Sequence, residues 1–338
     1  MLLGKSKVGA GCPTYIIAEI GQSHEGSLGN AMSYINLAKE CGANAVKFQT
    51  HFANEESTKH DQFRVNIFPQ DNSRYDYWKR VEFSENEWSL LNNHANDLGI
   101  DFISTPFSIK AFNLLNSLKI PFWKIGSGEI NNQPLMEAIL NSNRPIIAST
   151  GMSNWLEIDS LVKQLNSCNS EFAILQCTSS YPTPPELVGL NVIGEIKEKY
   201  NCITGLSDHS GKIYPSIAAI SYGASILEVH LTFSKKAFGP DISSSLDPDE
   251  FQMVVEARDY IYQMNSNPVD KDKSSESLEA TKKLFSRSLV LNRDVKKGEI
   301  LTRDDIAFKK PGGGKTFDEI ENFINQPAKR DYSKDDLL

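Results

Sequence analysis

The chain has 338 residues, 40% of them hydrophobic, and a net charge of −8. A chain of this length can bury at least one large core, and length alone suggests about two domains. The negative balance argues against a protein that captures nucleic acid or an anionic membrane through its overall charge, but it leaves room for a local basic pocket that binds a small anion.

The expected compartment follows from the N-terminal residues and from the cysteines. Residues 1–14 lack the apolar core of a signal peptide, and no stretch is long and apolar enough to cross a bilayer. The cysteines form no CxxC pair, and their number, 5, is odd, which is typical of buried or free thiols in a reducing compartment. The sequence therefore predicts a soluble, cytoplasmic protein.

Short apolar runs recur along the chain, and a stretch with helical spacing follows each of them. The predicted strands are TYIIAEI (14–20), NAVKFQ (44–49), DFISTP (101–106), PFWKIGS (121–127), PIIAST (145–150), FAILQCT (172–178), CITGLS (202–207) and SILEVHL (225–231). The predicted helices are residues 29–41, 85–99, 108–118, 134–142, 154–166, 185–199, 211–223 and 248–263. Strict alternation, with no GxGxxG turn after the first strand, favours a closed (β/α)8 TIM barrel over an open doubly wound sheet.

Residues 108–118 illustrate the helical pattern. Ile109, Phe112, Leu115 and Leu118 fall on one stripe, which is expected to face the sheet. Ser108 precedes the stripe and can cap the first turn of the helix with its hydroxyl group.

One long insertion, residues 51–84, separates the second predicted strand from its helix. Loops of this length on the catalytic face of a barrel are usually functional or disordered. Its aromatic residues Tyr75, Tyr77 and Trp78 are more typical of packing that pins a loop than of a platform for a ligand.

The composition changes after residue 264, and this change predicts the domain division. Residues 1–264 form the predicted barrel, and residues 265–283 are polar with few apolar anchors, which is typical of a linker. Residues 284–338 alternate short β-like runs with turns. About 55 residues make a small core, so this C-terminal domain is expected to pack on the barrel or on a second copy of the chain.

Two histidines end the seventh and eighth predicted strands, where a parallel barrel opens its active-site face. His209 and His230 could converge there and hold a divalent metal, with water and substrate oxygens in the open positions. Glu228 lies two residues before His230 on the same strand face and could orient a partner of the metal. The alternative is a pair of hydrogen-bonded structural histidines.

Two lysines lie within otherwise apolar strands, in VKFQ and WKIGS. Lys47 and Lys124 must face solvent, a counter-charge or a ligand, because an unpaired buried charge is costly. Together with Ser127, Ser149 and Ser207 they describe a pocket for a phosphate or carboxylate group. The alternative is that the lysines pair with barrel carboxylates such as that of Glu19.

The other histidines have fewer partners in the sequence. His24, in GQSHEG after the first strand, is a candidate for contact with a substrate. His51, His60 and His94 are expected to have surface or structural roles.

At these residues the chain resembles the sialic acid synthase family, which includes legionaminic and pseudaminic acid synthases. The resemblance runs through IIAEIGQSHEG, GANAVKFQ, STPF, KIGSGE, STGMS, QCTSSYPTP, GLSDHS, EVH and GPD, and then RSLV, KKGE and KKPG in the C-terminal domain. It implies a TIM barrel followed by an antifreeze-like SAF domain with a β-clip fold. It also implies a domain-swapped homodimer, in which each SAF domain covers the partner's barrel.

The resemblance assigns roles to residues position by position. Those that match phosphoenolpyruvate contacts are Lys47, Lys124, Ser127, Ser149 and Ser207, with Gln49 and Thr105 beside them. His209 and His230 match ligands of a metal, usually Mn²⁺, with Mg²⁺ or Co²⁺ as alternatives. Residues matching the reacting centre and the amino-sugar side are Glu19, Glu228, Asp241, Ser179, Tyr181 and Lys310.

The activity that the resemblance implies is a transferase reaction that forms a C–C bond. Phosphoenolpyruvate and an N-acetylated hexose, such as N-acetylmannosamine or a related amino sugar, would combine with water and release phosphate. C3 of phosphoenolpyruvate would attack the metal-polarised aldehyde, water would add at C2, and the C–O bond to phosphate would break. Glu19 or Glu228 would move protons, and the sequence does not distinguish the two.

The chain departs from the family pattern mainly on the sugar side. The family often has GxNH after the first strand, where this chain has Gln22, Ser23 and His24, and Ser179 stands where many members have Asn. Ile242 stands where histidine is frequent. Lys310 replaces the arginine of an RPG motif, which exchanges a planar, bidentate donor for a point charge. The expected chemistry is therefore that of the family, with a sugar that can differ from N-acetylmannosamine.

Two other functions compete with this interpretation. A catalytically silent binding protein could keep the barrel, but it would be expected to lose charged site residues, and here they are present. A metal-dependent aldolase acting on pyruvate would neither need the anion-binding serines nor release phosphate.

Overall fold

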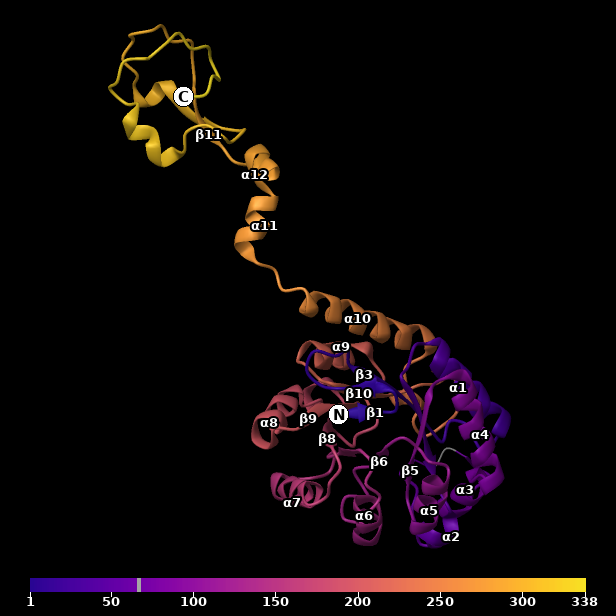
Figure 1. Ribbon diagram of the computed structural model, residues 1–338. Coiled ribbons are helices and arrows are strands. Elements are labelled where there is room, and N and C mark those ends of the chain that lie inside the picture. The colour runs from indigo at the N-terminus through magenta and orange to yellow at the C-terminus, as the bar shows by residue number, and fades with distance from the viewer. Residues whose placement is uncertain (66–67) are drawn as a thin grey trace. The chain divides into compact units, whose positions relative to one another are not determined.

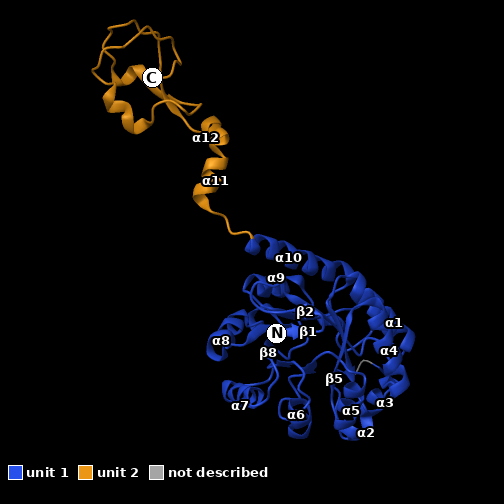
Figure 2. Ribbon diagram, in the orientation of Figure 1, with its two compact units in different colours: residues 1–266 blue, residues 267–338 orange. Residues whose placement is uncertain are grey.

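The computed structural model describes residues 1–65 and 68–338, which form two compact units, Met1–Ser266 and Asn267–Leu338 (Figures 1 and 2). The boundary between them falls two residues beyond the predicted end of the barrel at 264. Among the described residues, no helix combines the length and the apolar character that a membrane span needs.

The first unit is built around one parallel sheet, which confirms the predicted barrel. Its strands are β3 (Tyr15–Gly21), β4 (Ala45–Thr50), β5 (Asp101–Pro106), β6 (Trp123–Ile125), β7 (Ile146–Ser149), β8 (Phe172–Cys177), β9 (Ile203–Asp208) and β10 (Ile226–His230). They pair in the order β5-β4-β3-β10-β9-β8-β7-β6, and β5 lies against β6 to complete the circle. The carboxyl ends of all these strands therefore open on one face.

Helices surround the sheet (Figure 1). They are α1 (Leu28–Glu40), α4 (Glu85–Leu98), α5 (Ile109–Ser117), α6 (Gln133–Leu140), α7 (Trp155–Asn166), α8 (Leu190–Tyr200), α9 (Ile213–Ser221) and α10 (Pro248–Ser266), with 3₁₀ turns at Pro185–Leu187 and Ile242–Ser244. Each lies in or near its predicted range, because the apolar stripe that fixes the helix in sequence is also the face that packs on the sheet.

In α5 the Ser108 hydroxyl accepts a hydrogen bond from the Ala111 amide, as predicted for a cap. Phe112 and Leu115 are buried as predicted, but Ile109 is 42% exposed. The predicted stripe is therefore wrong at its first residue, Ile109, which begins the helix.

The inward-facing strand residues change from apolar to charged toward the open face. Ile17 on β3 and Ala45 on β4 belong to a buried apolar cluster inside the barrel. Two residues further along each strand, at the period of a pleated strand, Glu19 and Lys47 are register partners and face the same interior. The apolar layer thus supports a layer of charged groups above it.

A short hairpin precedes the barrel, and the sequence analysis did not predict it. Its strands are β1 (Leu2–Leu3) and β2 (Ser6–Lys7). Leu3 and Val8 pack in the inner apolar cluster of the barrel, so this segment covers the amino-terminal ends of the strands. Two-residue strands are too short to show a periodic pattern in the sequence.

Replacing Leu3 tests the contribution of the hairpin to stability. Leu3 is fully buried, whereas its neighbour Leu2 is 53% exposed. Leu3→Ala is expected to lower the free energy of unfolding by about 2–5 kcal/mol, because it leaves a cavity in the core. Leu2→Ala, the matched control, should change it by less than about 0.5 kcal/mol. Urea denaturation measures both, and equal effects would contradict the proposed packing.

The predicted insertion, residues 51–84, contains α2 (Ala53–Glu56) and α3 (Arg74–Val81) in its described part. Ser73 caps α3 by accepting a hydrogen bond from the Asp76 amide. Tyr77 on this helix is buried, in agreement with the loop-packing role predicted for it.

The second unit has its own small core. Its elements are α11 (Lys271–Ser277), α12 (Glu279–Phe285), β11 (Ser288–Leu291) and β12 (Ile306–Lys309), with 3₁₀ turns at Arg303–Asp305 and Phe317–Asn322. β11 and β12 are antiparallel, and Leu289, Leu291 and Leu301 form the centre of its apolar cluster. The segment predicted as a linker, 265–283, contains α11 and most of α12.

Candidate active site

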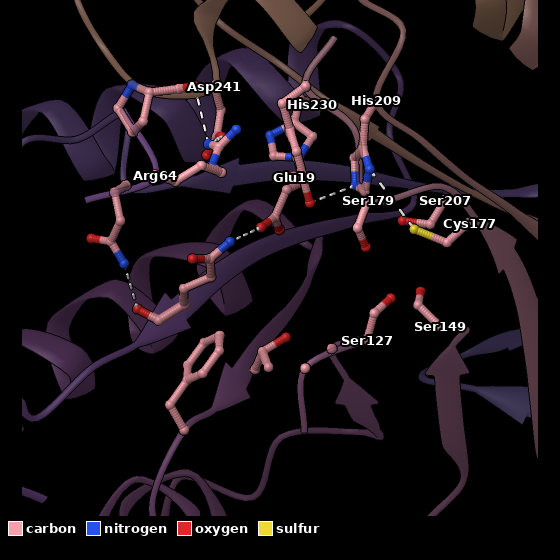
Figure 3. A pocket seen from close by; sticks show the side chains of 18 of the residues that line it. Glu19, Arg64, Ser127, Ser149, Cys177, Ser179, Ser207, His209, His230 and Asp241 are labelled. Atoms are coloured by element: carbon pink, nitrogen blue, oxygen red, sulfur yellow. Dashed lines mark hydrogen bonds and ion pairs between the residues drawn. The ribbon is translucent and has the colours of Figure 1, made fainter. Parts of the chain in front are cut away.

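A cavity of about 450 Å³ lies at the carboxyl ends of the barrel strands. Predicted site residues that line it are Glu19, Lys47, Gln49, Thr105, Lys124, Ser127, Ser149, Ser179, Tyr181, Ser207, His209, Glu228, His230 and Asp241. Figure 3 shows several of them converging, with Asp241 and Arg64 on one side of the histidines and the serines on the other. The fold thus brings together every predicted site residue of the barrel.

Lys47 lies at the base of this cavity between two carboxylates. Its Nζ is 2.8 Å from Glu19 Oε2 and 3.7 Å from Glu228 Oε1, and it donates to Thr105 Oγ1 at 3.3 Å. Burial would lower the pKa of Lys47, but the two carboxylates outweigh burial and the pKa is raised. The ion pair that we considered as the alternative for this lysine is therefore present, and it keeps the ammonium group charged inside the cavity.

Lys124 is held more loosely by carboxylates than Lys47. Its Nζ donates to Ser149 Oγ at 2.8 Å and lies 3.5 Å from Glu228 Oε1. Burial lowers the pKa of Lys124, although Glu228 opposes this effect. An ammonium group whose nearest partner is a neutral hydroxyl group can accept an anionic ligand without first losing a short ion pair.

Glu228 connects the two lysines. Burial would raise its pKa, but Lys124 and Lys47 outweigh burial and the pKa is lowered. Its Oε1 accepts from Ser207 Oγ at 3.3 Å, while Oε2 is buried without a hydrogen-bond partner among the described residues. A buried, unpartnered oxygen of this kind is expected to meet a ligand or water.

The backbone after β7 approaches the serines closely. The Gly151 amide donates to Ser127 Oγ at 2.9 Å. A Cβ atom on Gly151 would lie 2.5 Å from Ser179 Oγ and 2.8 Å from Cys177 Sγ, so no larger residue fits here without displacing these groups. Cys177, which burial keeps protonated by raising its pKa, is a lining residue that sequence analysis did not identify.

The two histidines both line the cavity, with ring centroids 5.4 Å apart. His209 Nδ1 is 2.9 Å from the Thr178 carbonyl oxygen, which can only accept, so the lone pair of the neutral ring is on Nε2. The Tyr181 hydroxyl group lies 3.3 Å from this Nε2. Burial, and then the neighbouring His230, lower the pKa of His209 to about 4, which favours the neutral ring.

This donor set fits a catalytic metal better than a structural one. Two neutral imidazoles suit a divalent transition metal, and a backbone partner that orients one ring is typical of metal sites. Within residues 1–65 and 68–338, no group of three His, Cys, Asp or Glu side chains is arranged to enclose an ion. His209 and His230 would therefore leave coordination positions open for substrate oxygens.

The rim of the cavity carries an arginine that the sequence analysis missed. Arg64 Nη2 donates to Asp241 Oδ1 at 2.6 Å and to the Pro240 carbonyl oxygen at 3.2 Å. Its guanidinium group also lies 4.2 Å from the centroid of the Tyr181 ring. Arg64 belongs to the long insertion and lies outside every motif found in the sequence. Its position at the cavity follows only from its contacts with Pro240 and Asp241, in the loop after β10.

Aromatic residues of the insertion also reach the cavity. Tyr77 and Trp78 both line it, so the residues that pack the insertion also form part of the cavity wall. The ring of His51 stacks on those of Trp78 and Phe107, with centroid distances of 3.9 Å and 4.3 Å. His51 has the structural role expected for it, since its Nδ1 lies 2.6 Å from Glu56.

Two candidates lie elsewhere. His24 is not among the residues that line the cavity, so the structure does not support the expectation that it contacts a substrate. Its Nδ1 accepts from the Gly26 amide at 3.1 Å and its ring stacks on Phe83 at 4.5 Å, so it supports the turn after β3. Lys310 belongs to the second unit, where its Nζ lies 5.0 Å from the Phe285 ring centroid.

Comparisons with known proteins match both units of this chain. The model of the NeuB family matches residues 34–269, and that of the SAF domain matches residues 286–338. The N,N'-diacetyllegionaminic acid synthase of Campylobacter jejuni is 34% identical over 331 residues, which are 96% of this chain and 98% of the relative. The N-acetylneuraminate-9-phosphate synthase of Homo sapiens is 32% identical over 342 residues, 98% of this chain and 93% of the relative.

A solved structure shows the same architecture. It is the N-acetylneuraminic acid (sialic acid) synthetase of Leptospira borgpetersenii in complex with citrate. It is 30% identical, superimposes with a TM-score of 0.74, and the match covers 83% of this chain and 96% of that chain.

Proposed function

This chain belongs to the NeuB family, the sialic acid synthases, and from this premise we propose that it condenses phosphoenolpyruvate with an N-acetylated hexose to make a nonulosonic acid. Water is consumed and phosphate is released. The observation that carries the proposal is the pair of ammonium groups, Lys47 and Lys124, which flank one carboxylate at the base of a cavity that also holds two histidines.

The base of the cavity supports phosphoenolpyruvate as the first substrate. The ammonium group of Lys124 and the hydroxyl groups of Ser127, Ser149 and Ser207 all lie there, and each can donate to an anionic oxygen. Phosphoenolpyruvate carries a carboxylate and a phosphate charged about −2 at neutral pH, so it needs several such donors.

The centre and the rim support the aldehyde substrate. His209 and His230 would hold Mn²⁺, or Mg²⁺ or Co²⁺, which when bound supplies a Lewis acid for the aldehyde oxygen of the open-chain sugar. On the rim, Asp241 Oδ1 accepts a hydrogen bond from Arg64 Nη2, and the Tyr181 ring lies beside the same guanidinium group. These groups would orient the hydroxyl and acylamino groups of the sugar.

The carboxylates would handle the protons of the reaction. C3 of phosphoenolpyruvate forms a bond to the aldehyde carbon, water adds at C2, and the C–O bond to phosphate breaks. Neither Glu228 Oε2 nor Glu19 Oε2 has a hydrogen-bond partner among the described residues, but the ammonium group of Lys47 lies 2.8 Å from Glu19 Oε2 and contacts Glu228 only through Oε1. Glu228 is therefore the better placed to accept the proton of this water. Glu19 is engaged on both sides, since Oε1 accepts from Gln49 at 2.7 Å and Oε2 contacts Lys47 at 2.8 Å.

A panel of amino sugars tests the proposal. The purified, manganese-loaded protein is incubated with phosphoenolpyruvate and each sugar, while released phosphate and the mass of the acidic product are measured. Phosphate release that depends on the sugar supports the synthase. No release with N-acetylmannosamine or with di-N-acetylated 6-deoxyhexoses would exclude it and favour a silent binding protein. An acid formed from free pyruvate without phosphate would favour the aldolase.

We further propose that the active form is a homodimer in which Lys310 of the SAF domain reaches the sugar bound by the other subunit. The matching position of Lys310 in the family motif supports this. Sedimentation equilibrium checks the dimer, and a monomer with full activity would contradict it.

Gly151→Ala tests the close approach of backbone to the serines. The new Cβ would collide with Ser179 Oγ and would move Ser127, so the KM for phosphoenolpyruvate is expected to rise by about 10-fold or more. Gly194→Ala is the matched control, because a Cβ there meets nothing within 4 Å and the site is on α8. Initial rates at varied phosphoenolpyruvate measure both variants. An unchanged KM in Gly151→Ala would contradict the assignment of this loop.

A further inference from the structure

Arg80, on α3, ties the long insertion to the loop after β3. Its Nε donates to Asp71 Oδ1 at 3.0 Å and its Nη2 donates to Asp71 Oδ2 at 2.8 Å, which is a bidentate contact within the insertion. Its Nη1 donates to Glu25 Oε2 at 3.3 Å, and Glu25 lies between β3 and α1. One guanidinium group therefore joins α3 to a loop that lies 55 positions away in the sequence.

The same guanidinium group lies over two aromatic rings of the cavity wall. Its central carbon is 5.0 Å from the centroid of the Phe68 ring and 5.3 Å from that of the Tyr77 ring. The two rings are nearly parallel, with an angle of 13° between them and centroids 5.7 Å apart. Phe68 and Tyr77 both line the cavity, whereas Arg80 is not among the lining residues. Arg80 therefore supports the wall and would act on a substrate only through these rings.

The backbone is also closely packed at this residue. Gly26 has a φ of 75°, in the left-handed region, and a Cβ atom there would lie 2.6 Å from the Arg80 carbonyl oxygen. Only glycine therefore fits where the loop after β3 meets α3. Gln22, earlier in the same loop, lines the cavity and donates to the Gln49 carbonyl oxygen at 3.2 Å. The loop and α3 are thus held against one another beside the cavity.

Loss of Arg80 would take the cation away from two carboxylates. Asp71 is 5% exposed, and its hydrogen bond to Arg80 is the main cause that raises the pKa of this arginine. Burial raises the pKa of Glu25 to about 7, and the charge of Arg80 opposes this effect. A buried carboxylate that loses its partner is costly, so without Arg80 the two segments are expected to move apart.

Tyr77 connects this cluster to the side of the cavity that we assign to the sugar. Burial, and then the charges of Glu25 and Asp241, raise the pKa of Tyr77, so its hydroxyl group stays protonated at neutral pH. This oxygen is buried and has no hydrogen-bond partner in the part of the chain that the structure describes, so it is expected to meet a ligand or water. Asp241 belongs to the rim, whereas the anion-binding groups Lys124 and Ser149 lie on β6 and β7.

We infer that Arg80 is a positioning residue for the sugar side of the site, which it serves by holding Phe68 and Tyr77 against the loop after β3. The inference rests on the proposed function and adds to it a residue that touches neither substrate. Misplacement of a site by about 1 Å can cost on the order of 100-fold in rate, even when the change lies far from the reacting atoms. The cost falls on the sugar, because the donors for phosphoenolpyruvate lie on other strands.

Arg80→Met tests this inference in the manganese-loaded protein. Initial rates are measured at varied phosphoenolpyruvate and at varied sugar, with whichever of N-acetylmannosamine or a di-N-acetylated 6-deoxyhexose reacts faster. The KM for the sugar is expected to rise about 10-fold or more, while the KM for phosphoenolpyruvate stays unchanged. An unchanged sugar KM, or an equal rise in both KM values, overturns the inference and leaves the synthase intact. No turnover by the unaltered protein overturns the proposed function, and this inference with it.

Arg144→Met is the matched control for loss of a half-buried arginine. The guanidinium group of Arg144 lies 5.6 Å from the Trp123 ring centroid and donates to the carbonyl oxygens of Ile120 and Asn116, each at 3.2 Å. Arg144 is not among the residues that line the cavity, so both KM values should stay unchanged in this variant. The same rise in the sugar KM in both arginine variants would show that the effect is not specific to Arg80.

Glu25→Gln gives a second test that holds even if Arg80→Met does not fold. It keeps the shape of the side chain and removes the charge that Arg80 meets. The sugar KM is expected to rise again, by a smaller factor, and hydrogen–deuterium exchange of residues 68–81 should become faster while that of α7 stays unchanged. The exchange experiment needs no turnover. Unchanged exchange of residues 68–81 together with an unchanged sugar KM in Glu25→Gln would overturn the inference.

Discussion

Lys124→Met is expected to lower the kcat/KM for phosphoenolpyruvate by about 10²- to 10³-fold. The ammonium group lies 3.5 Å from Glu228 Oε1 and 2.8 Å from Ser149 Oγ, and the side chain is 2% exposed. Truncating one partner of a buried charge pair costs about 2–5 kcal/mol, and each 1.36 kcal/mol is tenfold in rate. The loss should fall mainly on phosphoenolpyruvate, because Lys124 is at the base and not at the rim.

The measurement separates the two substrates. Initial rates at varied phosphoenolpyruvate and at varied sugar report each KM, and Lys163→Met on α7 is the control for loss of an exposed lysine. Thermal unfolding shows whether Lys124→Met still folds. Ser149→Ala, which removes only the hydroxyl partner, gives a milder effect on the same KM. An unchanged KM for phosphoenolpyruvate in both variants would contradict the anion site.

His230→Ala is expected to weaken binding of Mn²⁺ by at least about 100-fold and to abolish activity at stoichiometric metal. No cluster of three metal-binding side chains is found in the described part of the chain, so loss of one histidine leaves His209 alone. Changes to groups that merely surround a metal ligand already cost about 10- to 100-fold in affinity. Titration followed by electron paramagnetic resonance measures the binding without any substrate.

The chain offers a matched control for this histidine. His94 lies on α4, where its Nε2 is 2.8 Å from Asn36 Oδ1, and it is not among the residues that line the cavity. His94→Ala should bind Mn²⁺ like the unaltered protein. A His230→Ala variant that keeps full affinity and full activity would show that His230 is not a ligand. Removal of metal with a chelator, followed by recovery with Mn²⁺, tests the dependence itself.

The barrel could be predicted because its signals are local. Each strand is a short apolar run, and each helix carries a stripe of apolar residues at a period that short windows of sequence show. The same rule that places the carboxyl ends of the strands on one face predicts that Glu19, Lys124 and His230 meet there. Their presence in the lining of one cavity follows from that rule.

The pairings within the site could not be predicted in the same way. The sequence left open whether Lys47 pairs with a carboxylate, and the structure places it 2.8 Å from Glu19 and leaves Lys124 mainly with Ser149. His24 was a reasonable candidate from its position after the first strand. Its ring instead accepts from the Gly26 amide. Such choices depend on a few ångströms of packing, which no periodic pattern encodes.

By itself, the sequence determined the alternation of strands and helices in the barrel, the polar character of the strand ends and the family to which they point. Only the tertiary structure showed that Arg64 contacts Asp241, which lies 177 positions away in the sequence. It also showed that the N-terminal segment packs Leu3 and Val8 into the apolar cluster inside the barrel. The physical reason is that periodicity reports burial along one element, whereas a contact between distant segments depends on how loops fold back over the sheet.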